Sequence, residues 1–230
     1  MKNNMSIKEN LVNINARIKA AAEAAGRDAG EIKLIAVTKT YPVDMMNEAI
    51  SCGVTDVGEN KAQEVRDKFE RVRPVRWHLI GHLQTNKVKY VIDRCAMIHS
   101  VDSVRLMDEI ERLAAAHDTD MDILIQVNIS GEESKSGIAP EELNTLLSHA
   151  GELEHTHVKG LMTIAPLDDE AEPHFKNMKK LFDETARKEY KNVSMEELSM
   201  GMSGDFEAAI RCGATMVRIG SAIFGARNYN

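Results

Sequence analysis

The feature that most constrains the fold of this chain is a regular alternation of short β-rich apolar runs with segments of helical period. Eight runs predict strands, at residues 32–40, 55–59, 75–81, 96–101, 121–129, 158–164, 197–202 and 216–224. Helices are expected before the first run and between successive runs, at residues 4–26, 43–52, 60–71, 85–93, 103–117, 140–150, 172–191 and 205–212. This alternation favours an α/β fold, the (β/α)₈ TIM barrel, with an additional N-terminal helix. An open doubly wound sheet is the alternative, and one domain over residues 1–230 is expected.

An internal sequence repeat supports a fold built from similar units. Residues 49–57 and 209–217 share the pattern A-I-x-C-G-x-T-x-V. Each copy joins the end of a helix to the start of a strand, and Gly53 and Gly213 stand where left-handed backbone favours glycine.

The first predicted strand ends in a lysine. The run I-K-L-I-A-V-T-K-T is followed by Pro42, which stops a strand because it cannot donate to the ladder. Lys39 is therefore at a carboxyl end, where TIM barrels collect functional residues, and alternation puts it on one face with Ile35 and Val37. An amine in a partly dry barrel interior loses its proton more easily and can attack an aldehyde to form a Schiff base. A solvated lysine that caps the strand is the alternative.

Two glycine-serine elements near the end of the chain predict a phosphate site. M-G-M-S-G-D leads through Ser203 and Gly204 into a helix, and V-R-I-G-S puts Gly220 and Ser221 at the carboxyl end of the eighth strand. Glycine lets the backbone approach an anion, and amides at a helix N-terminus favour negative charge. Barrels commonly bind phosphate in the loops after strands seven and eight. Simple helix capping is the alternative for Ser203.

Arg218 lies two residues before Gly220, on the same face of the eighth strand. A cation deep in a barrel needs a partner, either a ligand atom or an acidic neighbour such as Glu59 or Glu197. A reactive lysine, a phosphate site and a buried cation together fit an aromatic cofactor that carries an aldehyde and a phosphate. Pyridoxal 5′-phosphate (PLP) has these groups.

Six segments carry a specific family resemblance. They are A-V-T-K-T at 36–40, G-E-N-K-A-Q-E at 58–64, W-H-L-I-G-H-L-Q-T-N-K at 77–87, K-G-L-M-T at 159–163, S-M-G-M-S-G-D at 199–205 and V-R-I-G-S-A-I-F-G at 217–225. Through these segments nearly the whole chain resembles the pyridoxal phosphate homeostasis proteins, small relatives of the N-terminal barrel of alanine racemase.

The resemblance implies a monomeric PLP-binding barrel of fold type III. It implies a Schiff base on Lys39, a pyridine nitrogen that faces Arg218, and a phosphate held around Ser203, Gly204, Gly220 and Ser221. It also implies a role in storing, buffering and delivering PLP in vitamin B6 and amino-acid homeostasis, without established catalytic turnover. Apo forms of PLP-dependent enzymes are the expected recipients.

Asn60 and Met200 complete the set of cofactor-binding candidates. Asn60 follows the second strand, and His82, Gln84, Asn86 and Lys87 follow the third, all on the functional side of a barrel. Capping and loop hydrogen bonds are the alternative for each of them. Met162 and Met200 are expected to line the barrel as flexible fillers, with plain core packing as the alternative for both.

Composition excludes several classes of function. The net charge of −7 argues against general nucleic-acid binding, and the apolar runs are too short to span a bilayer. Residues 1–30 hold no secretory signal, so a cytoplasmic protein is expected. The three cysteines lie far apart without a C-x-x-C pair, which favours buried thiols over disulfides or zinc.

Two enzymatic functions compete with a homeostasis role. A PLP-dependent racemase or decarboxylase would use the same lysine. However, racemisation needs a second acid-base group, which related racemases take from a partner chain through an additional β domain not expected here. An arginine beside the ring nitrogen also weakens the cofactor as an electron sink. The second rival is a cofactor-free barrel aldolase in which Lys39 attacks a sugar phosphate.

Overall fold

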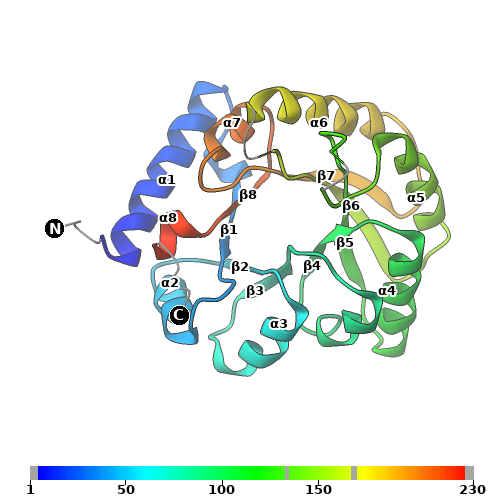
Figure 1. Cartoon of the computed structure of the whole chain (residues 1–230), viewed down its shortest axis with the longest axis horizontal. Helices are drawn as coiled ribbons and strands as arrows, with labels where there is room; N and C mark the ends of the chain where they lie inside the picture. The colour runs from blue at the N-terminus through cyan, green and yellow to red at the C-terminus, as the bar shows by residue number, and fades with distance from the viewer. Residues whose placement is uncertain (1–4, 133–134, 167–169, 226–230) are drawn as a thin grey trace.

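The computed structural model describes residues 5–132, 135–166 and 170–225, which form a closed barrel of eight parallel strands. The strands follow one another in chain order around the barrel, and β8 pairs with β1 to close it (Figure 1). They are β1 (Lys33–Val37), β2 (Asp56–Glu59), β3 (Arg76–Leu79), β4 (Met97–Val101), β5 (Met121–Gln126), β6 (Thr156–Met162), β7 (Val193–Ser199) and β8 (Met216–Ile219). The predicted (β/α)₈ barrel is confirmed, and the open doubly wound sheet is wrong.

Helices surround the barrel on its outside (Figure 1). The α-helices are α1 (Ile7–Ala24), α2 (Val43–Ser51), α3 (Ala62–Lys68), α4 (Val104–Ala116), α5 (Leu143–Ala150), α6 (Ala171–Ala186), α7 (Phe206–Arg211) and α8 (Ser221–Phe224). Short 3₁₀ helices are η1 (Ala29–Glu31), η2 (Phe69–Arg71), η3 (Thr85–Tyr90) and η4 (Pro140–Glu142). None of the helices within the described ranges combines the length and the apolar character needed to cross a membrane.

The additional N-terminal helix is α1, which begins in a capping box. The Ser6 hydroxyl accepts a hydrogen bond from the Glu9 amide, and the Glu9 carboxylate accepts one from the Ser6 amide. A stripe of apolar side chains at helical spacing is buried, namely Ile7, Leu11, Ile14 and Ile18. This stripe packs the helix beside α7 and α8, so that α1 covers the region where β8 meets β1 (Figure 1).

Several element boundaries differ from the sequence-based expectation, and three of these differences concern η3, β7 and β8. Residues 85–90 form the 3₁₀ helix η3 instead of an α-helix, because the segment is short and Gln84 provides no side-chain cap. Strand β7 begins at Val193, which pairs with Val158, and therefore earlier than the expected residue 197. The last run is strand only to Ile219, because the Gly220 backbone turns there and its carbonyl accepts the first hydrogen bonds of α8.

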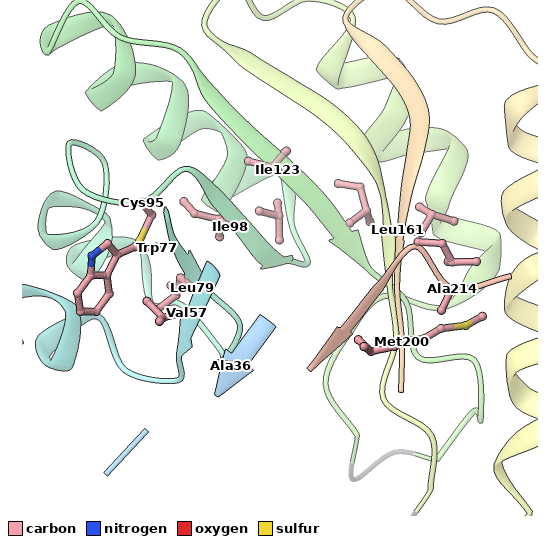
Figure 2. Packing of buried hydrophobic residues seen from close by; sticks show 14 of the residues in the cluster. Ala36, Val57, Trp77, Leu79, Cys95, Ile98, Ile123, Leu161, Met200 and Ala214 are labelled. Carbon is pink, nitrogen blue, oxygen red and sulfur yellow. The ribbon is translucent and has the colours of Figure 1, made fainter. Parts of the chain in front are cut away.

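The hydrophobic core has two parts, separated by the barrel wall. A large outer cluster fills the space between strands and helices, and Figure 2 shows members of it from successive strands, among them Ala36, Val57, Leu79, Ile98 and Ile123. A smaller inner cluster consists of Ile35, Met97, Leu124, Met162 and Met216. Neighbouring residues of one strand fall in different clusters, as the alternation of side chains across a strand requires. The predicted inward position of Met162 is therefore confirmed, whereas Met200 belongs to the outer cluster.

The two repeated helix-to-strand connections, in residues 49–57 and 209–217, have the same backbone geometry. Gly53 and Gly213 adopt φ values of 100° and 99°, in the left-handed half of the map. Each donates its amide to the residue three positions earlier, in α2 and α7 respectively. The repeat in the sequence is therefore a repeated helix-to-strand connection, as predicted.

Candidate functional site

A cavity of about 520 Å³ opens at the carboxyl ends of the strands. Seven of the eight predicted site residues line it, namely Lys39, Asn60, Ser203, Gly204, Arg218, Gly220 and Ser221. The eighth, Met200, is fully buried in the outer core cluster and does not line the cavity. Parallel strands bring their carboxyl ends to one rim of a barrel, and this explains how residues far apart in the sequence meet here.

Lys39 lies two residues beyond the end of β1. Its neighbour Thr38 is fully buried, and Thr40 has a φ of 67°, which is uncommon for a β-branched residue. The strand thus ends in a defined bend that directs the Lys39 segment to the cavity. Residues outside the cavity hold this bend in place.

Three charged side chains fix the segment on both sides of Lys39. Glu59 accepts a hydrogen bond from the Thr38 hydroxyl at 2.8 Å, and Lys68 donates to the Thr38 carbonyl at 3.1 Å. Glu64 accepts the Thr40 amide at 2.8 Å. Lys68 also joins the two carboxylates, with its Nζ 2.8 Å from an oxygen of each.

We call Glu59, Glu64 and Lys68 the lysine-loop clamp. Its two carboxylates differ in their pKa because they differ in burial. Burial raises the pKa of Glu59 to about 7, against the opposing effect of Lys68. Burial would also raise the pKa of Glu64, but hydrogen bonds from Lys68 and the Thr40 amide lower it overall. The Oε2 atom of Glu59 is buried and has no hydrogen-bond partner among the described residues.

Arg218 extends from β8 into the barrel and is only 3% exposed. Its guanidinium donates to the Ser199 hydroxyl at 2.6 Å and to the Thr163 carbonyl at 2.8 Å. The predicted alternative of an ion pair is wrong for both candidate carboxylates, because Glu59 pairs with Lys68 and Glu197 pairs with Lys33. Burial lowers the pKa of Arg218 to about 10, so the side chain remains a cation at neutral pH.

The loops after β7 and β8 lie against each other. The Gly220 amide donates to the Ser203 hydroxyl at 3.3 Å, and the Arg218 amide donates to the Gly201 carbonyl at 3.0 Å. Simple helix capping by Ser203 is wrong, because Asp205 occupies the N-cap position of α7. Within the described part of the chain, no group accepts a hydrogen bond from the amides of Ser203, Gly204 or Ser221.

Other residues of the cavity were not predicted from the sequence. They come mainly from the ends of β3, β5 and β6 and from the segments that follow these strands, and include Ile80, Gln126, Lys135, Ser136 and Ile164. The rule that carboxyl ends of barrel strands converge could have indicated Gln126, the last residue of β5. Of the four residues expected after the third strand, only His82 lines the cavity. Gln84 and Asn86 together line a neighbouring hollow, and Lys87 lies over the Tyr90 ring.

Known proteins resemble this chain over nearly its whole length. The family model described as alanine racemase, N-terminal domain, matches residues 10–228. The pyridoxal phosphate homeostasis protein of Aquifex aeolicus is 44% identical over 98% of this chain and 100% of its own length. The protein of the same name from Escherichia coli K12 is 39% identical over 97% of this chain and 98% of its own. The chain belongs to the pyridoxal phosphate homeostasis protein family. The family resemblance predicted from the sequence segments is thus confirmed.

Solved structures share the barrel. PipY of Synechococcus elongatus was solved with PLP bound and is 29% identical to this chain. The match covers 96% of this chain and 100% of PipY, with a TM-score of 0.83. A protein of Bifidobacterium adolescentis described as unknown is 36% identical, with a TM-score of 0.88 over 95% of this chain and 94% of its own. Alanine racemase of Clostridium difficile is 17% identical and shares the fold alone, with a TM-score of 0.72 over 98% of this chain and 58% of its own.

Proposed function

We propose that this protein binds PLP and that it stores, buffers and delivers the cofactor in vitamin B6 and amino-acid homeostasis. One observation carries the proposal: a single cavity gathers the Lys39 amine, the Arg218 guanidinium and the two glycine-serine loops. These groups match, in kind and number, the aldehyde, the ring nitrogen and the phosphate of PLP. The family names and the PLP-bound structure of PipY support the same cofactor.

The electrostatics of the cavity fit a phosphorylated ligand. Lys39, Lys135 and Arg218 line it, and none of its described lining residues is acidic, although the chain as a whole carries a net charge of −7. Three cations around one cavity attract a dianionic phosphate. The amides of Ser203, Gly204 and Ser221, which no described group engages, are donors that phosphate oxygens can accept.

The fit extends to the aromatic ring. Two of the five N–H groups of Arg218 are engaged by Ser199 and Thr163, which leaves N–H donors for a ligand acceptor. We propose that Arg218 donates to the pyridine nitrogen, that Lys39 holds the aldehyde carbon covalently, and that the two loops hold the phosphate. Asn60 also lines the cavity. We propose that it contacts the ligand as a neutral hydrogen-bonding group.

Met200 takes an indirect role in this proposal. The side chain packs in the outer core, three residues before Ser203, and does not line the cavity. We propose that it supports the loop that carries Ser203. Met202, two residues further, is the methionine that lines the cavity.

We propose a binding and delivery role in preference to racemase or decarboxylase turnover. PLP, when bound, supplies an electron sink that is strongest when its ring nitrogen is protonated. Arg218 can only donate hydrogen bonds and stays charged, so it disfavours a proton on the atom that it faces. A carboxylate at this position would have the opposite effect.

The remaining parts of the proposal concern context. We propose that residues 1–230 act as one PLP-binding domain, that the protein is a cytoplasmic monomer, and that apo forms of PLP-dependent enzymes receive the cofactor. Delivery is tested by mixing the PLP-loaded protein with an apo-transaminase and following the recovery of transaminase activity. Recovery faster than release of PLP into buffer supports direct delivery, and recovery at the release rate contradicts it.

The lysine assignment is tested by absorption spectroscopy on Lys39→Ala. Wild-type protein with PLP should show a visible band, and borohydride should fix the label on the peptide that contains Lys39. The variant should lose both, while Lys135→Ala, a second lysine of the same cavity, should keep both. A label on another lysine, or a colourless wild type after incubation with PLP, would overturn the proposal, and the colourless result would favour the cofactor-free aldolase.

A further inference from the structure

Five polar side chains form one continuous hydrogen-bonded chain inside the barrel, and we call them the inner chain. They are Asp56, His78, His99, Ser199 and Arg218. At one end, Asp56 Oδ1 lies 2.8 Å from His78 Nε2, and His78 Nδ1 lies 2.9 Å from His99 Nε2. At the other end, His99 Nδ1 lies 3.0 Å from Ser199 Oγ, which lies 2.6 Å from Arg218 Nη1. All five residues are at most 3% exposed.

The inner chain crosses the barrel from the amino ends of the strands to the cavity. Asp56 is the first residue of β2, and His78 and His99 follow on the neighbouring strands β3 and β4. Ser199 ends β7, and β5 and β6 separate that strand from β4 in the barrel. The hydrogen bond between His99 and Ser199 therefore spans the interior instead of following the wall.

The two ends of the inner chain determine the direction of every bond in it. Arg218 has only donors, so the Ser199 oxygen accepts its N–H. With both imidazoles neutral between this donor and the Asp56 acceptor, the Ser199 hydroxyl donates to His99 Nδ1. His99 then donates from Nε2 to His78 Nδ1, and His78 donates from Nε2 to the Asp56 carboxylate. Both neutral histidines are thus protonated on Nε2.

The ionisation of the groups agrees with this direction. Burial lowers the pKa of both His78 and His99, which keeps the two imidazoles neutral. Burial alone would raise the pKa of Asp56, but hydrogen bonds from His78 and Thr55 lower it overall, so the carboxylate is charged. The inner chain therefore connects a buried cation to a buried anion through three neutral groups.

We propose that Asp56, His78, His99 and Ser199 are positioning residues that hold Arg218 in the orientation needed at the pyridine nitrogen. This inference rests on the proposed function, because Arg218 faces that nitrogen only if PLP is the ligand. The inner chain orients the guanidinium, and the Asp56 carboxylate holds the His78 Nε2 proton at its far end. Asp205, in the β7–α7 loop, is the acidic group whose charge acts on Arg218. The inner chain is not a proton path to the cavity, because arginine has no acceptor through which a proton could pass.

The direction of the bonds is tested in the cofactor-free protein. Nitrogen-15 NMR of imidazole-labelled protein should show His78 and His99 as neutral rings protonated on Nε2. A ring protonated on Nδ1, or a charged imidazolium at neutral pH, would overturn the inner chain. This measurement does not require PLP, so it remains informative even if the proposed cofactor is wrong.

The positioning role is tested with Asp56→Asn against a matched control, Glu197→Gln. Glu197 is another carboxylate of the barrel strands, partly buried where Asp56 is buried, and it bonds Lys33 and Thr215 outside the inner chain. The Asn variant should bind PLP about tenfold more weakly, a loss of about 1.4 kcal/mol, while its affinity for inorganic phosphate stays unchanged. The control should match the wild type for both ligands.

A double-mutant cycle completes the test. In the Arg218→Ala background, Asp56→Asn should cause no further loss of PLP affinity, because the group that it positions is absent. Equal PLP affinity of Asp56→Asn and Glu197→Gln, or full additivity with Arg218→Ala, would overturn the positioning role. Failure of wild-type protein to bind PLP would instead overturn the proposed function.

Discussion

Replacement of Glu59 by glutamine should make the protein more stable at neutral and alkaline pH. Glu59 is the buried carboxyl of the lysine-loop clamp. One of its oxygens accepts hydrogen bonds from Lys68 and Thr38, and the other has no hydrogen-bond partner among the described residues. Burial raises its pKa from the ordinary value of 4.5 to about 7. Glutamine keeps the shape and one acceptor oxygen but cannot ionise, so it removes the cost of a buried negative charge.

The magnitude and sign follow from proton linkage. Between pH 4.5 and 7 the unfolded chain releases the Glu59 proton while the folded protein retains it, so the folded state binds more protons and wild-type stability falls as pH rises. The total loss is about 3 kcal/mol, since each pKa unit corresponds to about 1.4 kcal/mol. Wild type and Glu59→Gln should therefore be similar near pH 4.5, and the variant should be more stable by up to about 3 kcal/mol at pH 8.

Urea denaturation of both proteins from pH 4.5 to 8 measures this difference. Glu64→Gln is the matched control, because Glu64 bonds the same lysine but has a lowered pKa. Its carboxylate stabilises the folded state above the ordinary pKa, so this variant should be less stable than wild type at neutral pH and approach it as the solution is acidified. A stability difference for Glu59→Gln that stays constant from pH 5 to 8 would refute the reasoning, as would a Glu59 pKa near 4.5 by carbon-13 NMR.

Three further predictions concern the ligand, the barrel wall and catalysis. Arg218→Ala should weaken PLP binding by about 1–3 kcal/mol, because it removes a charge-assisted hydrogen bond; an unchanged dissociation constant in a fluorescence titration would place the side chain away from the ring. Gly160→Ala should lower the free energy of unfolding by at least about 2 kcal/mol, since φ is 152° there and an added Cβ would lie 1.8 Å from the Glu197 carbonyl oxygen. Gly204→Ala, whose added Cβ meets nothing within 4 Å, should change it by less than about 1 kcal/mol in the same urea assay. The PLP-loaded protein should show no alanine racemisation above background, and a Lys39-dependent rate of about 1 per second or more would contradict a binding role.

Much of the candidate site could be read from local patterns. A lysine just beyond the carboxyl end of a strand, and two glycine-serine turns placed before short helices, are defined by a few neighbouring residues. Their place at the carboxyl ends of barrel strands then follows from the fold rule alone. For this reason Lys39, Ser203, Gly204, Gly220 and Ser221 were all expected to line the cavity and do so.

Residues whose role depends on a distant neighbour could not be read in this way. Glu59 and Glu197 were equal candidates as partners of Arg218, yet Glu59 points outward to Lys68 on α3 and Glu197 bonds Lys33 at the other end of the barrel. Met200 was expected beside the ligand, and its side chain instead enters the outer core. Strand boundaries decide which face a side chain takes, and a shift of one residue reverses it.

The sequence by itself determined the order of elements, the closure of similar units into a barrel, and the identity of the groups at its carboxyl rim. Periodicity and turn chemistry act over a few residues, so they are visible in a single chain. Only the tertiary structure decided that Asp56, His78, His99, Ser199 and Arg218 form one chain of hydrogen bonds. These residues come from five strands and meet only inside the closed barrel, where burial forces each polar group to find a partner and leaves one direction for every bond.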